Sequence, residues 1–347
     1  MELKPGFSVK LKKGVQARII KELGRGGQGI VYLVDVSGRQ MALKWYHTPP
    51  SDRFYQNIER NISQGAPADA FIWPEYLTER TQGSYGYVMR LRPQDYCDFS
   101  DYLLAKWNFQ STNALLSAAM KICDGMKKLH LSGYSYQDLN DGNFFVRPSD
   151  GDVLICDNDN VMPQGTPSGI MGKVRYMAPE VVAGSLPDKN SDRFSLAVIL
   201  FLLFFKCHPF DGARTLSIPC MTEDLERRLY GTEILFMLDP TNESNRPVRG
   251  VHRNIFLLWP AFPSSLKLAF TEQFSHKILS NPSSRMIEKE WEDVIVQLRD
   301  QSVICSHCHD DVFVDLETHN FKCCSCGHTI DASRRLHIGN RSVVLTP

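Results

Sequence analysis

The sequence lacks a hydrophobic run long enough to cross a membrane. Its most apolar stretch, Phe194–Phe205, is about 12 residues long, whereas a transmembrane helix needs about 20. We therefore interpret it as a buried core helix. The N-terminal residues MELKPGFSVKLKKG also lack the apolar stretch of a secretory signal. Together these absences predict a cytoplasmic protein with no membrane partner.

The sequence also lacks a net charge, because its 39 Lys and Arg residues balance its 39 Asp and Glu residues. Without a basic excess, nothing attracts the whole chain to nucleic acid, and we expect no nucleic-acid partner. Hydrophobic residues make up 43% of the 347 residues. That content supports a sizeable core, and the length predicts one large two-lobed domain or two domains.

Cysteine is scarce and scattered before residue 300 but crowded after it, which is unlike an evenly spaced disulfide framework. Cys305 and Cys308 form one C-x2-C pair, and Cys323 and Cys326 form a second pair after a gap of 14 residues. This spacing predicts a structural Zn²⁺ site with four thiolates, carried on a β-hairpin within residues 312–321. We assign residues 301–347 to this zinc-ribbon-like module. The neighbouring side chains that could replace a ligand are Cys324, His307, His309 and His328.

The rest of the chain changes from strand-like to helical patterns. The segments VQARIIKELG, GIVYLVDV, RQMALKWY and SYGYVMRL are rich in β-branched and aromatic residues, and Arg53–Gln64 reads as a helix capped by Ser51 or Asp52. Helical spacing begins at Asn113, and a further helix follows a capping signal at Ser191 or Asp192. These patterns predict an α+β fold with a small β-rich N-terminal lobe (about 1–92) and a mostly helical C-terminal lobe (about 93–300).

A glycine-rich loop separates the first two of these strands. Gly24, Gly26 and Gly29 form G-x-G-x-x-G, and the strand containing Val31 follows directly. Glycines allow a backbone to pass close to phosphates and to present its N–H groups. Dinucleotide-binding folds share the pattern, but there the loop runs into a helix. A loop between two strands is instead expected to cover the phosphates of a nucleotide.

Lys44 lies in the apolar strand that follows. A lysine in such a place needs an anionic partner, and nucleotide phosphates would supply one. The alternative is an edge-strand lysine that reaches water. In the predicted helix that follows, the only carboxylate well inside is Glu59. We expect Glu59 to hold Lys44, with a solvent-facing Glu59 as the alternative.

The segment Tyr136–Val146, YQDLNDGNFFV, resembles the catalytic loop of the protein kinase family, H-R-D-L-x-x-x-N. Asp138 falls on the catalytic Asp, and Asn143 falls on the Asn that binds a metal ion. Asp157 follows the strand DVLIC, where the family has D-F-G. The resemblance implies that Asp138 accepts or orients the substrate hydroxyl, and that Asn143 and Asp157 hold Mg²⁺ or Mn²⁺ on ATP.

Further matches extend the resemblance over about residues 15–298. The segment Gly172–Glu180 is similar to the G-T-x-x-Y-x-A-P-E end of the activation segment, Asp192 to the Asp that braces the catalytic loop, and Arg285 to the Arg that pairs with the last Glu. The resemblance implies a bilobal protein kinase fold and Ser/Thr phosphorylation of a protein substrate. DLNDGNFF and ICDNDN look like a bacterial subtype, whose members often accompany von Willebrand A-type and PP2C-type phosphatase proteins.

Several positions depart from the family pattern. Gln137 replaces an Arg that binds a phosphorylated activation loop, so we expect activity without such phosphorylation. Asn158 and Asp159 replace Phe and Gly. Asn140 replaces a Lys that contacts the γ-phosphate, and Lys173 stands where the family has Thr.

We hypothesise that Lys173 takes over the role of the missing Lys, against the alternative of a solvent-facing side chain. The leading function is thus an active Ser/Thr protein kinase. A nucleotide-binding pseudokinase scaffold that acts through its zinc ribbon is the alternative, followed by transfer of phosphate to a small molecule or of AMP.

Overall fold

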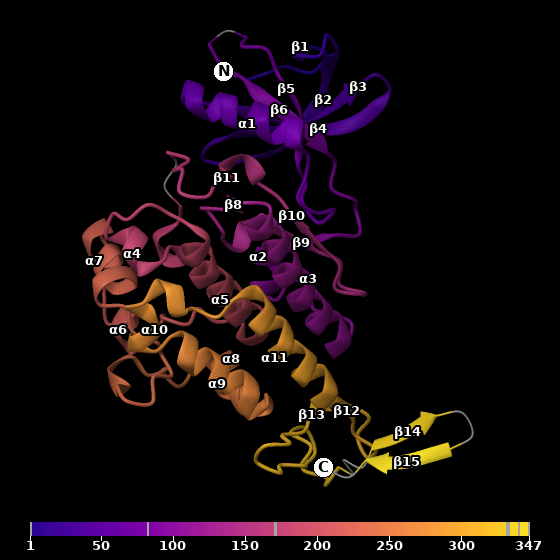
Figure 1. The fold of residues 1–347 in the computed structure, drawn as a ribbon, viewed down its shortest axis with the longest axis vertical. Helices are drawn as coiled ribbons and strands as arrows, with labels where there is room; N and C mark the ends of the chain where they lie inside the picture. Colours follow the sequence, from indigo (N-terminus) through magenta and orange to yellow (C-terminus); the bar gives the residue numbers. More distant parts are fainter. Residues whose placement is uncertain (1, 82, 170–171, 331–333, 339–340, 346–347) are drawn as a thin grey trace.

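The computed structural model describes the chain except residues 1, 82, 170–171, 331–333, 339–340 and 346–347. It has two lobes, with a small C-terminal module at the far end of the second lobe (Figure 1). The upper lobe in this view is mainly β-sheet and the lower lobe is mainly helical. The predicted α+β fold class with two lobes is confirmed.

The N-lobe is a sheet of six strands in the order β1-β2-β3-β4-β6-β5, with every neighbouring pair antiparallel. Apolar clusters cover both faces of this sheet, as alternation along a strand requires. Its elements are β1 (Ser8–Lys10), β2 (Gln16–Arg25), β3 (Gly29–Val36), β4 (Arg39–Tyr46), α1 (Asp52–Gln64), β5 (Pro74–Leu77) and β6 (Gly86–Arg90).

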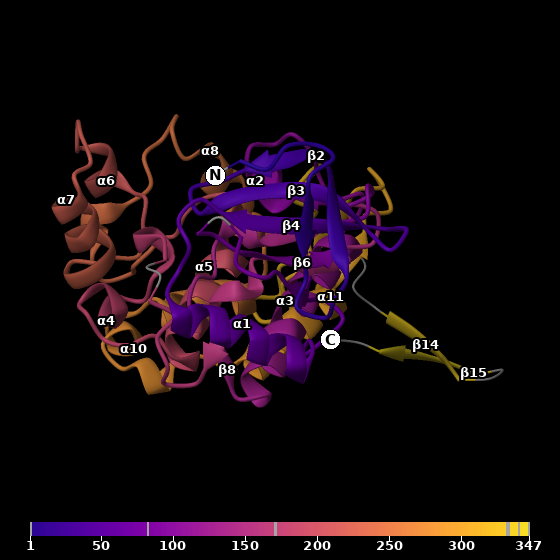
Figure 2. The same ribbon diagram turned by 90° about the horizontal axis from the view of Figure 1, so that it is seen from above.

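Helix α1 runs alongside this sheet (Figure 2). Ser51 caps it, because the Ser51 hydroxyl accepts a hydrogen bond from the N–H of Phe54 at 3.3 Å. The buried side of the helix carries Phe54 and Ile58 together with two asparagines, Asn57 and Asn61. The helix therefore presents amides rather than carboxylates to the interior.

The C-lobe is built around α5 (Lys189–Phe205), whose residues from Phe194 onward are all buried. This confirms the predicted core helix, and no helix in the described part of the chain is long and apolar enough to cross a membrane. The other helices are α2 (Phe99–Leu103), α3 (Thr112–Leu131), α4 (Pro179–Val182), α6 (Ala213–Leu216), α7 (Glu223–Arg227), α8 (Arg253–Leu258), α9 (Ser264–Gln273), α10 (His276–Leu279) and α11 (Glu288–Gln301).

Short strands line the side of the C-lobe that faces the sheet. Two small antiparallel ladders place the segments around residues 136–143 and 156–161 next to each other. Their strands are β7 (Cys97–Asp98), β8 (Tyr134–Ser135), β9 (Phe144–Val146), β10 (Val153–Ile155) and β11 (Met162–Pro163).

Helix α5 begins earlier than the sequence suggested. Its N-cap is Asp188, whose carboxylate accepts hydrogen bonds from the N–H groups of Asn190 and Ser191. The predicted cap at Ser191 or Asp192 is wrong, because both lie inside the first turn. Asp192 is therefore free to turn its carboxylate inward, where it accepts hydrogen bonds from the N–H groups of Tyr136 at 2.6 Å and Gln137 at 2.9 Å.

A buried histidine joins three of these helices. His130 of α3 contacts Asp192 of α5 at 3.0 Å and Glu288 of α11 at 2.9 Å. Burial disfavours its charge, but the two carboxylates outweigh burial and raise the pKa of His130 to about 9. Burial also opposes the charge of Glu288, yet His130 and Arg193 hold the pKa of its carboxyl at about 2. A protonated His130 thus ties the helical core to the carboxylate that braces residues 136–137.

The C-terminal module follows α11 directly. β12 (Ser302–Ile304) pairs with β13 (Asp311–Phe313) around the first C-x2-C pair, so the β-hairpin of the module lies earlier in the chain than the predicted residues 312–321, where Asp315 and Asn320 form a single antiparallel bridge with two backbone hydrogen bonds. A second hairpin, β14 (Arg334–Ile338) with β15 (Arg341–Leu345), extends from the module in both views (Figures 1 and 2).

The module packs against the C-lobe through specific contacts. The Phe313 ring lies 4.9 Å from that of Phe262, centroid to centroid. Asp315 accepts hydrogen bonds from the N–H of Ser264 at 2.9 Å and from its hydroxyl at 2.6 Å. Because Ser264 opens α9, this carboxylate satisfies an otherwise unpaired N–H at a helix N-terminus. The module is therefore part of the C-lobe surface rather than a loosely tethered tail.

The His130 network predicts a specific dependence of stability on pH. Because folding raises the pKa of His130 from 6.5 to about 9, its contribution is complete below about pH 6.5 and is lost as pH rises through about 9. We expect the melting temperature to fall between pH 7 and 9.5 more steeply for the wild type than for His130→Gln. Thermal unfolding across this range measures both slopes. Parallel slopes would show that His130 is not the group responsible.

Candidate active site and cysteine cluster

The glycine-rich loop is the turn between β2 and β3. A Cβ at Gly29 would lie 2.3 Å from the carbonyl oxygen of Trp45, so packing against β4 requires glycine there. A Cβ at Gly24 or Gly26 would meet no atom of the described chain within 4 Å. Nothing in the protein explains glycine at these two positions, but a phosphate group that approaches the backbone would explain it.

Lys44 on β4 points to the junction of the two lobes and is 5% exposed. Its ammonium lies 2.8 Å from Asp159, 3.3 Å from Asp157 and 3.0 Å from the side-chain oxygen of Gln28 in the glycine-rich loop. Burial works against its charge, but Asp159 and Asp157 outweigh burial and raise the pKa of Lys44. The ammonium is thus held beside the glycine-rich loop in its charged form.

The predicted pairing of Lys44 with Glu59 is wrong. Glu59 is 51% exposed and forms an ion pair with Lys12 at 2.6 Å on the outer side of α1. At about 100° per residue, two residues separate Glu59 from Asn57, so its side chain points roughly opposite to that buried amide. The solvent-facing alternative is the correct one. The apolar residues Phe54, Ile58 and Ile62 recur every four residues and indicate the buried side of the helix, and Glu59 lies outside this stripe.

Asp138 lies in the loop after β8, where residues of two segments contact it. The Asn140 amide donates to one carboxylate oxygen at 3.2 Å, and the Asn160 amide donates to the other at 3.3 Å. Burial and the nearby charge of Asp157 raise the pKa of Asp138 to about 6, against the lowering effect of Asn140. A carboxylate with this pKa is ionised at neutral pH and can accept a proton near it.

Asn143 and Asp157 belong to neighbouring segments. The Asn143 carbonyl accepts a hydrogen bond from the N–H of Cys156 at 2.8 Å, and the Tyr136 hydroxyl donates to the carbonyl of Cys156. Asp157 has a left-handed backbone with φ of 55°, and its side chain is 46% exposed. The Asn143 side-chain oxygen accepts a hydrogen bond from the N–H of Asn140 at 2.7 Å and keeps a second lone pair, so together with the accessible Asp157 carboxylate it offers oxygen donors of the kind that suit Mg²⁺.

Asn158 takes a different role from the Phe that the family pattern expects. It is fully buried, and its amide donates to the carbonyls of Ile72 and Ile155, both at 2.9 Å. Polar bonds to backbone groups therefore replace an apolar contact at this position.

Lys173 lies against the loop that contains Asp138. Its ammonium is 3.0 Å from Asp141, and a Cβ at Gly142 would lie 3.9 Å from it. The side chain is 57% exposed, so it combines contact with the loop and access to solvent. It thus stands next to residues 140–142, where the family's Lys is missing.

Gln137 holds the segment that runs from Asp157 towards Glu180. Its amide nitrogen donates to the Thr166 carbonyl at 2.6 Å, and its oxygen accepts from the Ser168 N–H at 2.8 Å. The far end of the segment is fixed by a bidentate pair, because Arg285 contacts both oxygens of Glu180 at 2.7 Å. The predicted Arg285–Glu180 pair is confirmed. From the sequence, Gln137 could be recognised only as a replacement of the family's Arg, because the neighbouring residues do not indicate which groups its amide contacts.

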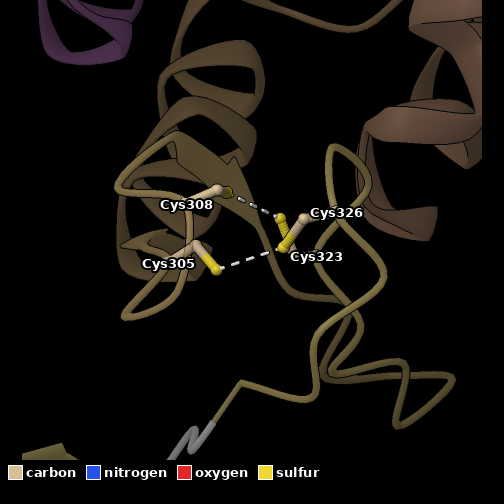
Figure 3. A group of neighbouring side chains, drawn as sticks. All are labelled: Cys305, Cys308, Cys323 and Cys326. Carbon is tan, nitrogen blue, oxygen red and sulfur yellow. Dashed lines mark hydrogen bonds between the residues drawn. The ribbon is translucent and has the colours of Figure 1, made fainter.

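The four predicted cysteines lie together in the C-terminal module (Figure 3). The sulfur atoms of Cys305 and Cys326 are 3.8 Å apart, and those of Cys308 and Cys323 are 3.6 Å apart. Four thiolates around Zn²⁺ at about 2.3 Å give sulfur separations of about 3.8 Å, so this cluster fits such an ion. Cys324 is exposed and outside the cluster, and the rings of His307 and His328 stack on each other.

Comparison with known proteins identifies the family. The profile of the protein kinase domain matches residues 17–247. The chain is 29% identical over 208 residues to the serine/threonine-protein kinase Pkn1 of Myxococcus xanthus, and this match covers 56% of this chain and 29% of Pkn1. It is 24% identical over 332 residues to the protein kinase YegI of Escherichia coli K12, and this match covers 87% of this chain and 48% of YegI. The chain thus spans less than half the length of either relative.

Solved structures support the fold. The crystal structure of the Mycobacterium tuberculosis PknI kinase domain, a C20A_R136A double mutant, superposes with a TM-score of 0.57 at 18% identity, over 86% of this chain and 99% of that chain. At this identity the likeness concerns the fold alone. Because the match to the protein kinase domain extends over more than half of the sequence, the chain belongs to the protein kinase family.

Proposed function

We propose that this protein is an ATP- and Mg²⁺-dependent kinase that transfers the γ-phosphoryl group of ATP to Ser or Thr hydroxyls of a protein substrate. The observation that carries the proposal is the position of Lys44, whose buried ammonium lies 3.3 Å from Asp157 and beside the glycine-rich loop. The Ser/Thr preference is supported by the similarity to the serine/threonine-protein kinase Pkn1 of Myxococcus xanthus.

The residues divide the work of phosphoryl transfer. Lys44 and the N–H groups of the glycine-rich loop bind the phosphates, and Asn143 and Asp157 would hold Mg²⁺ or Mn²⁺, which would neutralise phosphate charge. Asp138 orients the substrate hydroxyl and takes its proton as the new O–P bond forms and the bond from the γ-phosphorus to the bridging oxygen breaks, which releases ADP. Its pKa of about 6 leaves it ionised at neutral pH.

A pseudokinase scaffold is the competing function. It is favoured by the contact between Gln28 and Lys44, because the side-chain oxygen of Gln28 occupies an N–H donor of the Lys44 ammonium that a phosphate would need. It is also favoured by Asn140, which stands in place of the family's Lys. The position of Asp138, Asn143 and Asp157 in adjacent segments favours the enzyme, because a scaffold has no need of all three together with Lys44.

We propose that Lys173 replaces the missing Lys of the catalytic loop. Its ammonium contacts Asp141 on the same loop, and transferring phosphoryl groups need a cation near the charge that develops in the transition state. A small movement from Asp141 towards a bound phosphate would complete this role.

We also propose that Cys305, Cys308, Cys323 and Cys326 bind one structural Zn²⁺. The site is closed by four protein ligands, so it has no open position for catalysis. Its thiolates must stay reduced, which is consistent with action in the cytoplasm. Partnership with phosphatase and von Willebrand A-type proteins is a proposal that rests on the subtype resemblance alone.

The central prediction concerns label transfer. Purified protein incubated with γ-labelled ATP and Mg²⁺ should label itself or proteins of a lysate, and Asp157→Ala should abolish this because a metal ligand is lost. α-labelled ATP in a parallel reaction should leave no label, which separates phosphoryl from nucleotidyl transfer. A folded wild type that labels nothing would leave the scaffold as the better account.

The second prediction concerns Lys173. Lys173→Ala should lower kcat at least tenfold, equivalent to about 1.4 kcal/mol of transition-state stabilisation, and should change KM for ATP less. Lys289→Ala is the matched control, because Lys289 is similarly exposed at 59% and also pairs with an Asp, Asp293, but lies on α11. Initial rates with saturating substrate measure the change in kcat. A loss of less than tenfold rules out the replacement.

The third prediction concerns the metal. Elemental analysis should find about one zinc ion per chain, retained in Cys324→Ser and lost in Cys308→Ser. Metal loss should also lower the melting temperature, since the module that carries Asp315 would no longer hold the start of α9. A metal-free wild type with an unchanged melting temperature after chelator treatment would contradict the zinc site.

A further inference from the structure

The position of Lys44 raises the question of what holds it. Helix α1 contains two carboxylates, Asp52 and Glu59. Asp52 lies at its N-terminal end and pairs with Arg80, whereas Glu59 pairs with Lys12 on the exposed side. The interior side of α1 carries Asn57 and Asn61 instead. Glu59 therefore lies outside the buried side of α1 that faces the interior.

Asp159 is the carboxylate that the interior provides. It is fully buried, and one of its oxygens lies 2.8 Å from the Lys44 ammonium and 2.5 Å from the Tyr46 hydroxyl. Lys44 and Tyr46 are two residues apart on β4, so their side chains leave the same face of the strand. A buried carboxylate with two donors from one strand is fixed relative to that strand.

Asp157 is less suited to the same task. It is 46% exposed and lies 3.3 Å from Lys44, and its accessible carboxylate is the group expected to contact a metal ion. A carboxylate that binds a cation attracts a neighbouring ammonium less strongly. Asp159 has no access to solvent and can keep its hold on Lys44 when a metal and nucleotide are bound.

Helix α1 is attached to the same segment in another way. The amides of Asn57 and Asn61 both donate to the Val161 carbonyl, at 2.8 and 2.9 Å. The residues from Asp157 to Val161 therefore contact both Lys44 and α1, while the polar partners of the Lys44 ammonium among the described residues are Gln28, Asp157 and Asp159, none of which is in α1.

We propose that Asp159 is the positioning residue for Lys44, in place of a carboxylate on helix α1, an inference that rests on the kinase function proposed above. Lys44 is oriented by β4, by the segment Asp157–Val161 and by the Gln28 side chain, without a carboxylate from α1. Because α1 supplies no carboxylate to Lys44, a movement of α1 would reach the lysine only through the Val161 carbonyl and not by making and breaking a lysine–helix ion pair.

The experiment is a charge-rescue cycle on stability. Lys44→Met leaves Asp159 buried without its cation, which should lower the melting temperature by roughly 5 °C or more. Adding Asp159→Asn removes the unpaired charge and should recover at least half of that loss. Adding Glu59→Gln to Lys44→Met is the matched control and should recover nothing. Recovery with Glu59→Gln, or none with Asp159→Asn, overturns the inference.

Nucleotide binding tests the positioning role itself. Asp159→Asn should weaken the affinity for MgADP at least fivefold by calorimetry, but should add nothing to the weakening caused by Lys44→Met, because Asp159 acts through Lys44. Glu59→Gln should leave the affinity within twofold of the wild type. An additive effect of Asp159→Asn in the Lys44→Met background shows a purely structural role and overturns the inference.

The two proposals can fail separately. A wild type that transfers no phosphate, yet binds MgADP and shows this cycle, refutes the kinase function and keeps Asp159 as the holder of Lys44. A wild type that labels a protein substrate, with Asp159→Asn unchanged in both nucleotide affinity and kcat, keeps the kinase and overturns the positioning role.

Discussion

The arrangement of the active site depends on one buried ion pair, between Lys44 and Asp159. Burying either charge alone would cost several kcal/mol, so the β4 strand and the segment after β10 must meet in one register. The Tyr46 hydroxyl adds a second donor to the same carboxylate. Once this contact is made, Asp157 is placed two residues away at the junction of the lobes, and the accessible carboxylate and the buried ammonium face the same space beside the glycine-rich loop.

Around this pair, neutral amides do much of the positioning that charged and apolar groups do in the family pattern. Asn158 donates to the carbonyls of Ile72 and Ile155, Asn160 donates to Asp138, and Asn57 and Asn61 both donate to the Val161 carbonyl. Each such bond contributes only about 0.5–1.5 kcal/mol net, but an unsatisfied buried partner would cost more. The position of the segment after Asp157 is therefore fixed by hydrogen bonds to residues of both lobes.

Much of this could be predicted from the sequence, and the failures have a common cause. Strands β3 and β4 and the positions of Asp138, Asn143 and Asp157 follow from short local patterns, as do the four clustered cysteines. The prediction that Glu59 pairs with Lys44 failed because this contact depends on which side of α1 is buried. The predicted start of α5 was wrong because Asp188 and Ser191 are both good helix caps. Asp159 and Gln137 were visible only as departures, since their partners are about 30 to 115 residues away in the chain. Local sequence patterns identify the residues that carry the chemistry, whereas the contact partners of those residues are determined by the packing of distant segments.

Gln137 shows how such a departure changes the contacts of the segment that follows Asp157. An Arg at this position would carry a charge that needs an anion, and in the family that anion is a phosphate on the activation segment. The Gln137 amide nitrogen donates to the Thr166 carbonyl and to the Ser135 hydroxyl, and its oxygen accepts from the Ser168 N–H, so its groups match partners already present in the chain. It presents no positive charge to a phosphate. Neutral bonds to the backbone hold residues 166 and 168, and the Arg285–Glu180 pair holds the far end of the segment. A phosphate that bound at Gln137 would therefore have to displace these bonds, because no positive charge of Gln137 is present to complete a contact with it.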